Sequence, residues 1–415
     1  MSQTKVLVLF AGAALSASAL AGNPDTDRAY AAELKADALA RSSASESTGL
    51  ALAEGDSKVQ LGGFTQFRYY ANFRDDPTGT SGATSGHDSG FTNGFEATRT
   101  RLQATGNVMS KDVTFKVEGQ FDAGGEFGLL DAFVRWGFDN GGGIIIGQWQ
   151  NPVWREWANS PRGELGADYS VVTEVFNPGY TQGIGYNIRQ DQWGLFVSAN
   201  DGFRSGNTPY TSPNEADYGA TARFEWKGAG DWKSFDDFSG WRGQDTSWLI
   251  GLGVHWQHNG NTASTGSPVQ GNLIQAALDG QVEGNGWNVY AAFIFNHQNP
   301  DGTGNSSLND FGAVLQGGVF VSDNVELFAS WNGVFADSDY GSGADEDFHT
   351  LSAGANFYPF AKSNAVKITG EICWFFNKTT ENALVNGIAG SNVVFLRPSD
   401  EENQFGVVGQ LQVGF

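Results

Sequence analysis

The strongest constraint on the fold is an alternation of apolar and polar residues that continues from Lys58 to the end of the chain. In the last thirteen residues, NQFGVVGQLQVGF (403–415), every second residue is apolar or glycine, and the residues between are largely amides and glycines. An extended strand places alternate side chains on opposite faces. This segment therefore predicts a strand with one apolar and one polar face. Two settings suit it, a barrel strand facing lipid or the edge strand of a soluble sandwich.

The alternation recurs in sixteen segments. Residues 112–122 show it most clearly, because Val113 and Phe115 fall on one face while Lys116 and Glu118 fall on the other. An even strand number and strands of about ten residues suit a bacterial barrel that crosses a bilayer at a tilt. We therefore predict an all-β, transmembrane, antiparallel up-and-down β-barrel of about 16 strands, with 18 as the alternative count. The predicted strands cover 58–72, 95–107, 112–122, 128–138, 142–149, 182–189, 192–200, 217–227, 246–257, 271–284, 286–297, 309–321, 324–336, 347–358, 364–377 and 403–415.

The connections between these segments alternate between short and long, as in barrels with short turns at one end and long loops at the other. Two connections break the alternation. Residues 123–127 are short where a loop is due, and residues 228–245 are long where a turn is due. The longer one predicts either a structured insertion at the turn end or a strand count that is off by two. Aromatic residues near strand ends predict girdles at the membrane interface: Trp136, Phe138, Trp149, Trp226, Trp256, Trp287, Tyr358, Phe360, Phe375 and Phe415.

The first 57 residues differ from the rest. Lys5, an apolar run over 6–15 and the sequence Ala19-Leu20-Ala21 are typical of a cleaved export signal, which we assign to residues 1–21. Residues 22–57 are predicted to form a periplasmic linker or short helix, either as a tether, as an arm contacting other protomers, or as a disordered segment. The barrel then covers 58–415, and export with a barrel predicts an outer-membrane location.

Composition excludes several classes of function. The net charge of −22 argues against a nucleic-acid partner, which would require a basic face. The single cysteine, Cys373, cannot form an internal disulfide. The five histidines are scattered and no metalloprotease, serine-hydrolase or phosphate-loop motif is present, so neither enzymatic activity nor a cofactor is predicted. His255 is predicted to face the lumen with Gln257 as a solvated wall residue.

Charged residues on the polar faces are the candidates for pore lining. In the first four strands these faces carry five basic residues, Arg68, Arg99, Arg101, Lys116 and Arg135. Charges on an inward face meet water and set ion selectivity. Two arrangements are open. The basic residues form a basic wall, or they pair locally with Glu118 and Asp131 and leave no net field.

The connection 150–181 is the third external one. Its charged residues include Arg155, Glu156, Arg162, Glu164 and Asp168. Loops of this length are usually functional, and its aromatic residues and prolines favour packing. We predict that it folds into the lumen as a constriction whose acidic groups face the basic wall; the alternative is a surface-exposed loop. In a second interpretation Trp154 and Trp157 form a stacking track for sugar rings.

The stretch DSDYGSGADED (337–347) concentrates acids and glycines as calcium sites do, but it has no glutamate at the closing position. A solvated acidic loop is the main interpretation, and Asp337, Asp339 and Asp345 form a weak calcium candidate. No other metal site is predicted.

Four segments carry a resemblance to a known family: IGQWQNPV (146–153), SANDG (198–202), GANFYPF (354–360) and the terminal strand with Leu411, Val413 and Phe415. They resemble bacterial outer-membrane porins of the phosphate-selective porin O/P type. The resemblance implies a sixteen-stranded homotrimer with an inward-folded third loop and with basic lumen residues that attract anions. It implies passive diffusion of small hydrophilic solutes or ions, with anion or phosphate preference. A carbohydrate channel and a plugged structural or adhesion barrel remain alternatives. The terminal strand is similar to the signal read by the barrel-assembly machinery.

Overall fold

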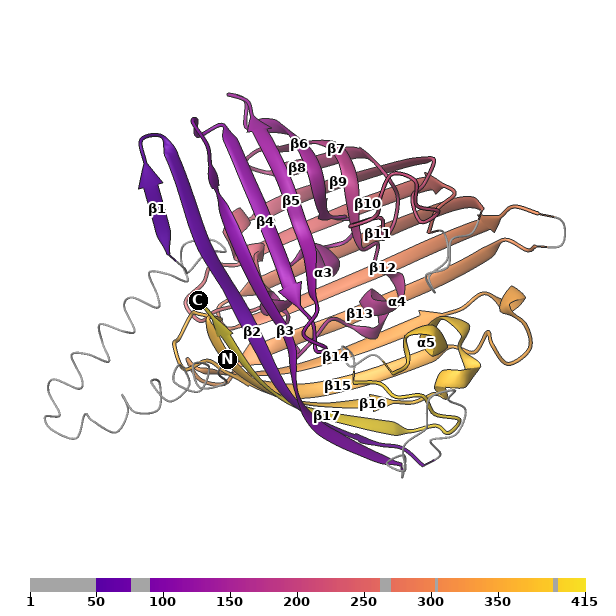
Figure 1. Cartoon of the computed structure of the whole chain (residues 1–415). Helices are drawn as coiled ribbons and strands as arrows, with labels where there is room; N and C mark the ends of the chain where they lie inside the picture. The colour runs from indigo at the N-terminus through magenta and orange to yellow at the C-terminus, as the bar shows by residue number, and fades with distance from the viewer. Residues whose placement is uncertain (1–49, 76–89, 262–269, 303–304, 391–394) are drawn as a thin grey trace, which may run out of the picture.

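The computed structural model describes residues 50–75, 90–261, 270–302, 305–390 and 395–415. In this part of the chain sixteen antiparallel strands, β2 to β17, form a closed barrel (Figure 1). Successive strands pair with each other, and β17 pairs with β2 to close the cylinder. The predicted fold class and strand number are confirmed. No helix in the described ranges is long and apolar enough to cross a membrane.

The bounds of the elements agree closely with the sequence segments. The strands are β1 (Ala51–Glu54), β2 (Ser57–Phe73), β3 (Phe91–Asn107), β4 (Val113–Phe121), β5 (Phe127–Gly137), β6 (Gly142–Gln150), β7 (Tyr180–Arg189), β8 (Trp193–Asn200), β9 (Tyr218–Ala229), β10 (Ser247–His258), β11 (Gly271–Gly284), β12 (Trp287–Pro300), β13 (Leu308–Phe320), β14 (Val325–Phe335), β15 (Phe348–Phe357), β16 (Val366–Phe375) and β17 (Gln404–Gly414). The short helices are α3 (Arg155–Ala158), α4 (Val171–Phe176) and α5 (Ala383–Ile388), with 3₁₀ turns η1 (Pro161–Gly163), η2 (Trp232–Phe235), η3 (Ser338–Tyr340) and η4 (Thr379–Glu381).

The short strand β1 lies within the predicted linker 22–57. It forms a hairpin with the start of β2, pairing Ala51 with Gln60 and Glu54 with Ser57. Gly55 has φ +58°, a conformation that tight hairpin turns need and that glycine adopts without strain. The end of the linker is therefore strand rather than coil or helix. The signal segment and the rest of the linker, residues 1–49, lie outside the described residues.

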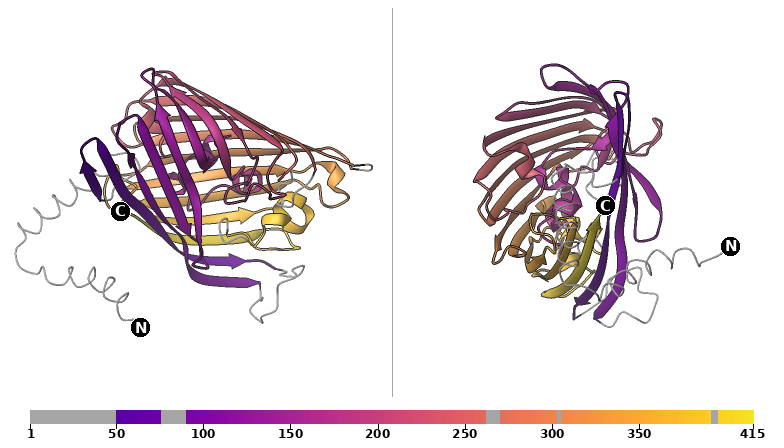
Figure 2. Two further views of the ribbon diagram at one scale, coloured as in Figure 1. Left: turned by 45° about the horizontal axis from the view of Figure 1, so that its top comes forward. Right: turned by 90° about the vertical axis from the view of Figure 1, so that its left-hand side faces the viewer.

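The two irregular connections are both present. β4 and β5 are joined by only residues 122–126 at the loop end of the barrel, whereas β9 and β10 are joined by residues 230–246 at the turn end. The long segment is an insertion in a barrel of sixteen strands, so it does not signal two missed strands. Because the strand number is even, β2 begins and β17 ends at the same turn end, shown from two sides in Figure 2.

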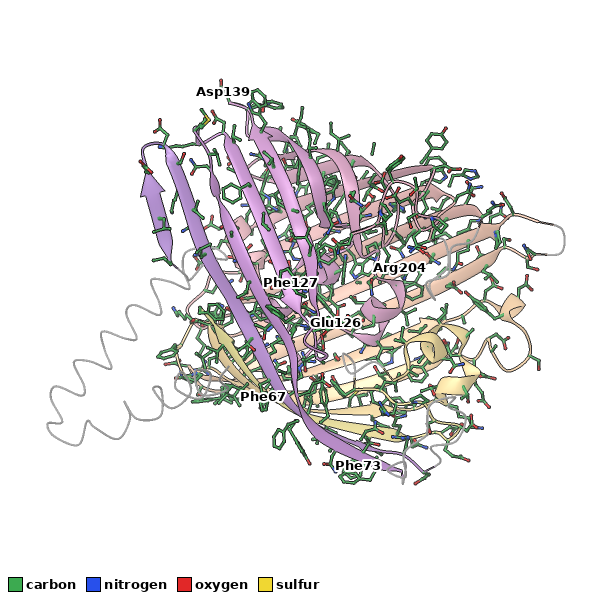
Figure 3. All side chains as sticks on the ribbon, in the orientation of Figure 1. Phe67, Phe73, Glu126, Phe127, Asp139 and Arg204 are labelled. Carbon is green, nitrogen blue, oxygen red and sulfur yellow. The ribbon has the colours of Figure 1, made fainter. Side chains whose placement is uncertain are left out.

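The outer surface of the strands is apolar. On β17 Phe405 and Leu411 are exposed, whereas Gln410 and Gln412 point inward and are buried. Figure 3 shows Phe67 and Phe73 on the outer side of β2. Of the aromatic residues predicted at the interface, six are exposed: Trp136, Phe138, Trp226, Trp256, Trp287 and Phe415. The prediction is wrong for Trp149, Tyr358 and Phe375, which are buried.

A hydrophobic core fills much of the interior, which the alternation alone does not predict. Inward residues such as Tyr290, Ile294 and Val334 belong to one buried apolar cluster that also includes residues of α4 and α5 and Phe395. Burying one such side chain contributes about 1.5–3 kcal/mol, so the segments inside the barrel are stabilised like a protein core. The sequence does carry a signal. Residues 289–295, VYAAFIF, are apolar on both faces, as expected for a strand with an exposed apolar outer face and an apolar core on its inner face.

Phe415 extends the seam between β17 and β2 that closes the barrel. Its backbone N–H donates to Gly63 O and its carbonyl oxygen accepts from Gly63 N, both at 2.9 Å. An unpaired backbone group in lipid costs several kcal/mol. Deleting Phe415 should therefore lower the yield of heat-modifiable barrel in membranes by at least about fivefold, measured by electrophoretic mobility with and without boiling. Phe415→Trp, which keeps the backbone pair, is the matched control. Normal assembly of the truncated chain would contradict this role of Phe415.

Candidate functional site

The connection between β6 and β7, the third at the loop end, lies inside the barrel. We call residues 151–179 the lumen loop. Its segments α3, η1 and α4 fold against the inner wall, where Val153, Trp154 and Leu165 are almost completely buried. Ser170 precedes α4, and its Oγ accepts a 3.0 Å hydrogen bond from Thr173 N, which caps the helix.

Glu156 holds the lumen loop in its fold. Its carboxylate accepts hydrogen bonds from Ser170 N (2.6 Å), Ser170 Oγ (2.9 Å) and Thr173 Oγ1 (2.8 Å). It therefore joins α3 to the N-terminal end of α4. Burial raises the pKa of this carboxyl, although the three donors act against that rise. The side chain is occupied within the loop and does not face an open pore.

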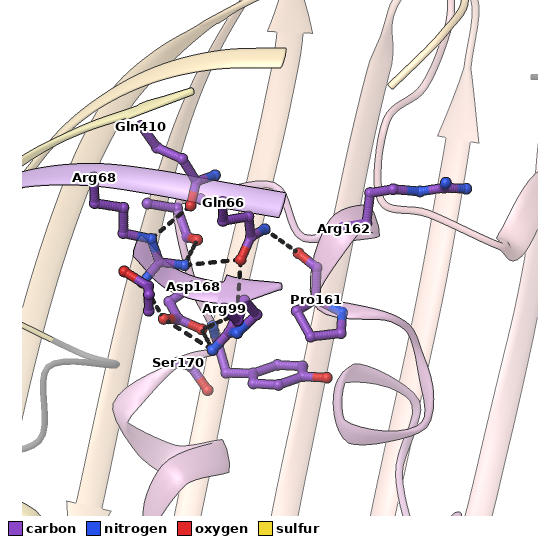
Figure 4. A network of polar contacts seen from close by, with 12 residues as sticks. Gln66, Arg68, Arg99, Pro161, Arg162, Asp168, Ser170 and Gln410 are labelled. Carbon is purple, nitrogen blue, oxygen red and sulfur yellow. Dashed lines mark hydrogen bonds and ion pairs between the residues drawn. The ribbon is translucent and has the colours of Figure 1, made fainter. Parts of the chain in front are cut away.

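Asp168 ties the lumen loop to β2 and β3 (Figure 4). Its carboxylate forms a close ion pair with Arg68 Nη1 and accepts 3.0 Å hydrogen bonds from Arg99 Nη1 and Nη2. Arg68 also donates to Ala167 O (2.6 Å) and to Gln410 Oε1 (2.6 Å). All three charged side chains are buried. Two of the predicted basic wall residues, Arg68 and Arg99, thus contact the loop directly. Their charges pair with Asp168 and do not face it across an open lumen.

A β-bulge in β3 directs these side chains. Gln66 pairs with Arg99 but Phe67 pairs with Ala97, so Thr98 is an extra residue in β3. Thr98 and Arg99 are consequently both buried on the inner side. Bulges redirect side chains in this way and are frequent next to functional sites.

A second ionic cluster ties the opposite side of the lumen loop to β9 and β11. Arg223 donates to both carboxylate oxygens of Asp279 (2.8 and 2.9 Å) and to Val153 O (3.0 Å). Arg155 of the loop donates to Glu225 Oε1 (3.1 Å). The loop is therefore held between two opposite regions of the wall. Sequence reasoning missed the wall residues of this cluster, although Arg223 and Glu225 alternate on the polar face of a predicted strand.

A third contact involves Lys367 of β16, which donates from Nζ to Glu164 O at 2.6 Å. The side chain of Glu164 is buried as well, and its Oε1 has no hydrogen-bond partner in the described residues. Burial, and next the charge of Glu156, raise the pKa of Glu164 well above its usual range. Glu164 is therefore a buried carboxyl whose surroundings favour the protonated form.

The remaining wall charges pair locally. Glu118 contacts Arg101 (3.0 Å) and Lys116 (3.2 Å), and Lys116 also contacts Asp131 (2.9 Å). Arg135 lies beside the turn end, where its Nε donates to Asn187 Oδ1 at 2.8 Å. Local pairing, the second of the two sequence-based alternatives, thus describes Arg101 and Lys116.

An open space remains between the lumen loop and β2–β4. It has a volume of about 60 Å³, enough for water or a small ion. Arg101, Lys116 and Arg162 line it together with the single carboxylate of Glu118. Another cavity, of about 30 Å³, lies on the other side of the loop beside Asp168 and Glu371. The larger space is thus lined by more positive than negative groups.

The structure corrects the aromatic-track hypothesis. Trp154 is buried, with Nε1 donating to Thr173 Oγ1 at 3.0 Å. Trp157 packs against Tyr169 and Tyr180, with ring centroids 5.6 and 6.1 Å apart. Both indoles form part of the core of the loop, so their faces are covered and cannot stack on a passing sugar.

Two further sequence interpretations are wrong. No three His, Cys, Asp or Glu residues among those described could hold a metal ion. In the calcium candidate, the carboxylate of Asp337 instead accepts from the backbone of Asn309 (2.7 Å) and Asp339 (2.8 Å). His255 does face inward, but it is buried rather than solvated, because Phe203 stacks on it at 4.2 Å.

Comparisons with known proteins agree with the barrel. No family model matches the chain, and no curated protein matches it. Among solved structures, OmpT of Vibrio cholerae is 11% identical with a TM-score of 0.55, covering 88% of this chain and 100% of that one. The outer-membrane channel DcaP of Acinetobacter baumannii is 15% identical with a TM-score of 0.54, covering 88% and 99%. OmpF of Salmonella typhi, solved with daunomycin, is 12% identical with a TM-score of 0.57, covering 88% and 100%. The chain therefore has the barrel fold of these outer-membrane proteins.

The Asp168 contacts predict a strong effect of one substitution. Asp168→Asn leaves the buried guanidinium groups of Arg68 and Arg99 without their carboxylate, and removing one partner of a buried pair costs about 3–5 kcal/mol. Urea unfolding of the detergent-solubilised barrel, followed by tryptophan fluorescence, should show a loss of that size. Asp339→Asn, at an exposed loop carboxylate, is the control. Equal stability of the two variants would show that the ion pairs do not hold the loop.

The buried carboxyl of Glu164 predicts a dependence on pH. Its folded-state pKa lies above the unfolded value of about 4.5, so the folded loop retains a proton that the unfolded loop releases. The stability of the loop should therefore be greatest below about pH 4.5 and should fall as pH rises toward the folded pKa. Proteolysis of the lumen loop at a series of pH values should follow this trend. Glu164→Gln should weaken the dependence of the proteolysis rate on pH. Glu381→Gln, at a half-exposed carboxylate, is the control and should leave it unchanged. A pH dependence that E164Q does not alter would refute the role of the Glu164 carboxyl.

Proposed function

We propose that this chain is an outer-membrane channel that admits small hydrophilic solutes by passive diffusion and prefers anions. The observation that carries the proposal is the space of about 60 Å³ between the lumen loop and the wall, with three cationic side chains and one carboxylate around it. The lumen loop would act as the constriction. The barrel fold shared with outer-membrane proteins, DcaP among them described as a channel, supports the general part of the proposal.

The anion preference follows from the balance of charge. Arg101 and Lys116 share Glu118, and Lys116 also contacts Asp131, so local pairing weakens the positive field without reversing it. Arg162 adds a cation from the lumen loop on the other side of the space. In a narrow, partly desolvated passage a single excess charge acts strongly, because the effective dielectric constant is below that of water. The resemblance to phosphate-selective porins makes phosphate the first solute to test.

The remaining parts of the proposal concern assembly and location. We propose that residues 1–21 direct export, that the terminal strand with Leu411, Val413 and Phe415 is read by the barrel-assembly machinery, and that the barrel inserts into the outer membrane. A homotrimer is supported by the family resemblance and by one similar structure, of a Vibrio cholerae protein, that is described as a trimer. No catalysis and no cofactor are part of this function.

The apolar core inside the barrel favours one alternative, a plugged structural or adhesion barrel. Inward residues of β11–β16 pack against the lumen loop and the chain around α5. If these contacts closed every path, the barrel would conduct nothing.

A planar bilayer separates the two functions. The reconstituted protein should conduct, and in a potassium chloride gradient its reversal potential should show anion preference. Replacing both Arg101 and Lys116 by Gln should lower the anion-to-cation permeability ratio at least about threefold, because the space then retains one cation against the Glu118 carboxylate. Lys111→Gln, at an exposed turn, is the matched control. Cation preference in the unaltered protein would refute the anion assignment, and a silent, well-assembled barrel would favour the plug.

A further inference from the structure

The long connection at the turn end crosses the mouth of the barrel. Residues 230–246 leave β9 and return to β10, which are neighbouring strands that a tight turn could join. Instead the segment reaches far beyond these two strands. Its contacts divide into four groups: one at each side of the mouth, one beneath the lumen loop, and one with the wall of β11 and β14.

At one side the segment is held by Trp232. The indole Nε1 donates to Gln190 O at 2.8 Å, in the turn between β7 and β8. The cationic groups of Arg189 and Lys227 lie 4.6 and 5.6 Å from its ring centroid. Cation–π contacts at these distances fix the ring against the rim.

At the other side the segment is held by Trp241. Its ring lies 4.8 Å from that of Tyr358 and 5.2 Å from that of Phe320. Ser239 Oγ is 3.0 Å from Tyr358 Oη, and Arg242 Nη2 donates to Phe320 O at 2.9 Å. Phe320 ends β13 and Tyr358 directly follows β15, so the segment extends across the mouth rather than along its rim.

Between these contacts the segment meets the lumen loop from below. Phe235 and Phe238 are buried, and Phe238 N donates to Gly163 O of the loop at 3.1 Å. The guanidinium of Arg155 lies 5.3 Å from the ring centroid of Phe235. A Cβ atom at Gly163 would lie 3.0 Å from Asp236 O, so the two chains approach as closely as a glycine permits.

The segment also covers an acidic part of the wall. Glu283 of β11 accepts a hydrogen bond from Gln244, and Glu326 of β14 lies 3.4 Å from Ser239 Oγ. Both carboxylates are fully buried. Gln281 Nε2 donates to Asp237 O at 2.8 Å, which holds the segment over the same strands. The basic space at β2–β4 is lined by other residues and does not include this segment.

We infer that residues 230–246 form a second constriction, which closes the acidic β10–β16 side of the lumen beneath the lumen loop and confines solutes to the basic side at β2–β4. The inference rests on the proposed channel function. The segment is then a determinant of both solute size and charge preference. Small anions pass on the open side, while the carboxylates Glu283 and Glu326 are withheld from the permeation path.

The test replaces residues 231–245 by a two-residue Asn-Gly turn and compares both proteins in a planar bilayer. We expect the single-channel conductance to rise at least twofold and the reversal potential in a potassium chloride gradient to move toward cation preference. Adding Glu283→Gln and Glu326→Gln to the shortened protein should restore the anion preference. The raised conductance should remain. Unchanged conductance and selectivity in the shortened protein, with a conducting parent, would overturn the inference but leave the channel function intact.

A full-length variant covers the case in which the shortened chain does not assemble. Phe235→Ala with Phe238→Ala removes the apolar contacts beneath the lumen loop and keeps the segment. It should show frequent transitions to a state of higher conductance and lower anion preference. Phe138→Ala, at an exposed position near another turn, is the matched control and should behave like the parent. A double variant identical to this control would overturn the inference, and a silent parent would overturn the proposed function together with it.

Discussion

Every backbone polar group of a chain in lipid must find its partner within the protein, and the rest of this structure depends on that constraint. It is met by sixteen strands whose first and last members pair from Phe64 to Phe73 and from Phe405 to Gly414. Because the barrel is closed, it has no edge strand whose backbone groups side chains would have to cover. The outer face can then be uniformly apolar, and the inner face can carry the ionic clusters that hold the loops.

The interior is organised as a protein core with ionic ties at its margins. Apolar side chains of the lumen loop cover inward residues of β11–β16, and Asp168 and Arg155 connect the loop to opposite parts of the wall. A loop with only apolar contacts could shift along the wall, whereas paired charges have defined partners. The ion pairs therefore specify where the loop lies, and the location of the loop decides which wall residues line the remaining space.

The sequence predicted the strands because period-two alternation is a local property. It also predicted an inward role for the loop at 150–181, from its aromatic residues and prolines. Other features depend on non-local pairing and could not be predicted. The extra residue Thr98 turns Arg99 toward Asp168, and Arg223 meets Asp279 across three strands. Trp149, Tyr358 and Phe375 look like girdle residues by position, but all three are buried; Tyr358 follows the end of β15 and packs against Trp241. The unusual length of 228–245 was visible, whereas its path across the mouth was not.

The central claim is that the open path lies between the lumen loop and β2–β4 and not on the opposite side. Cysteine accessibility tests it most directly, with Gln103→Cys on the open side and Gln281→Cys on the closed side, each in a Cys373→Ser background. A negatively charged methanethiosulfonate reagent should react rapidly at position 103 and reduce the current, while position 281 stays protected. Faster reaction at position 281, or protection at both positions in a conducting barrel, would contradict the account.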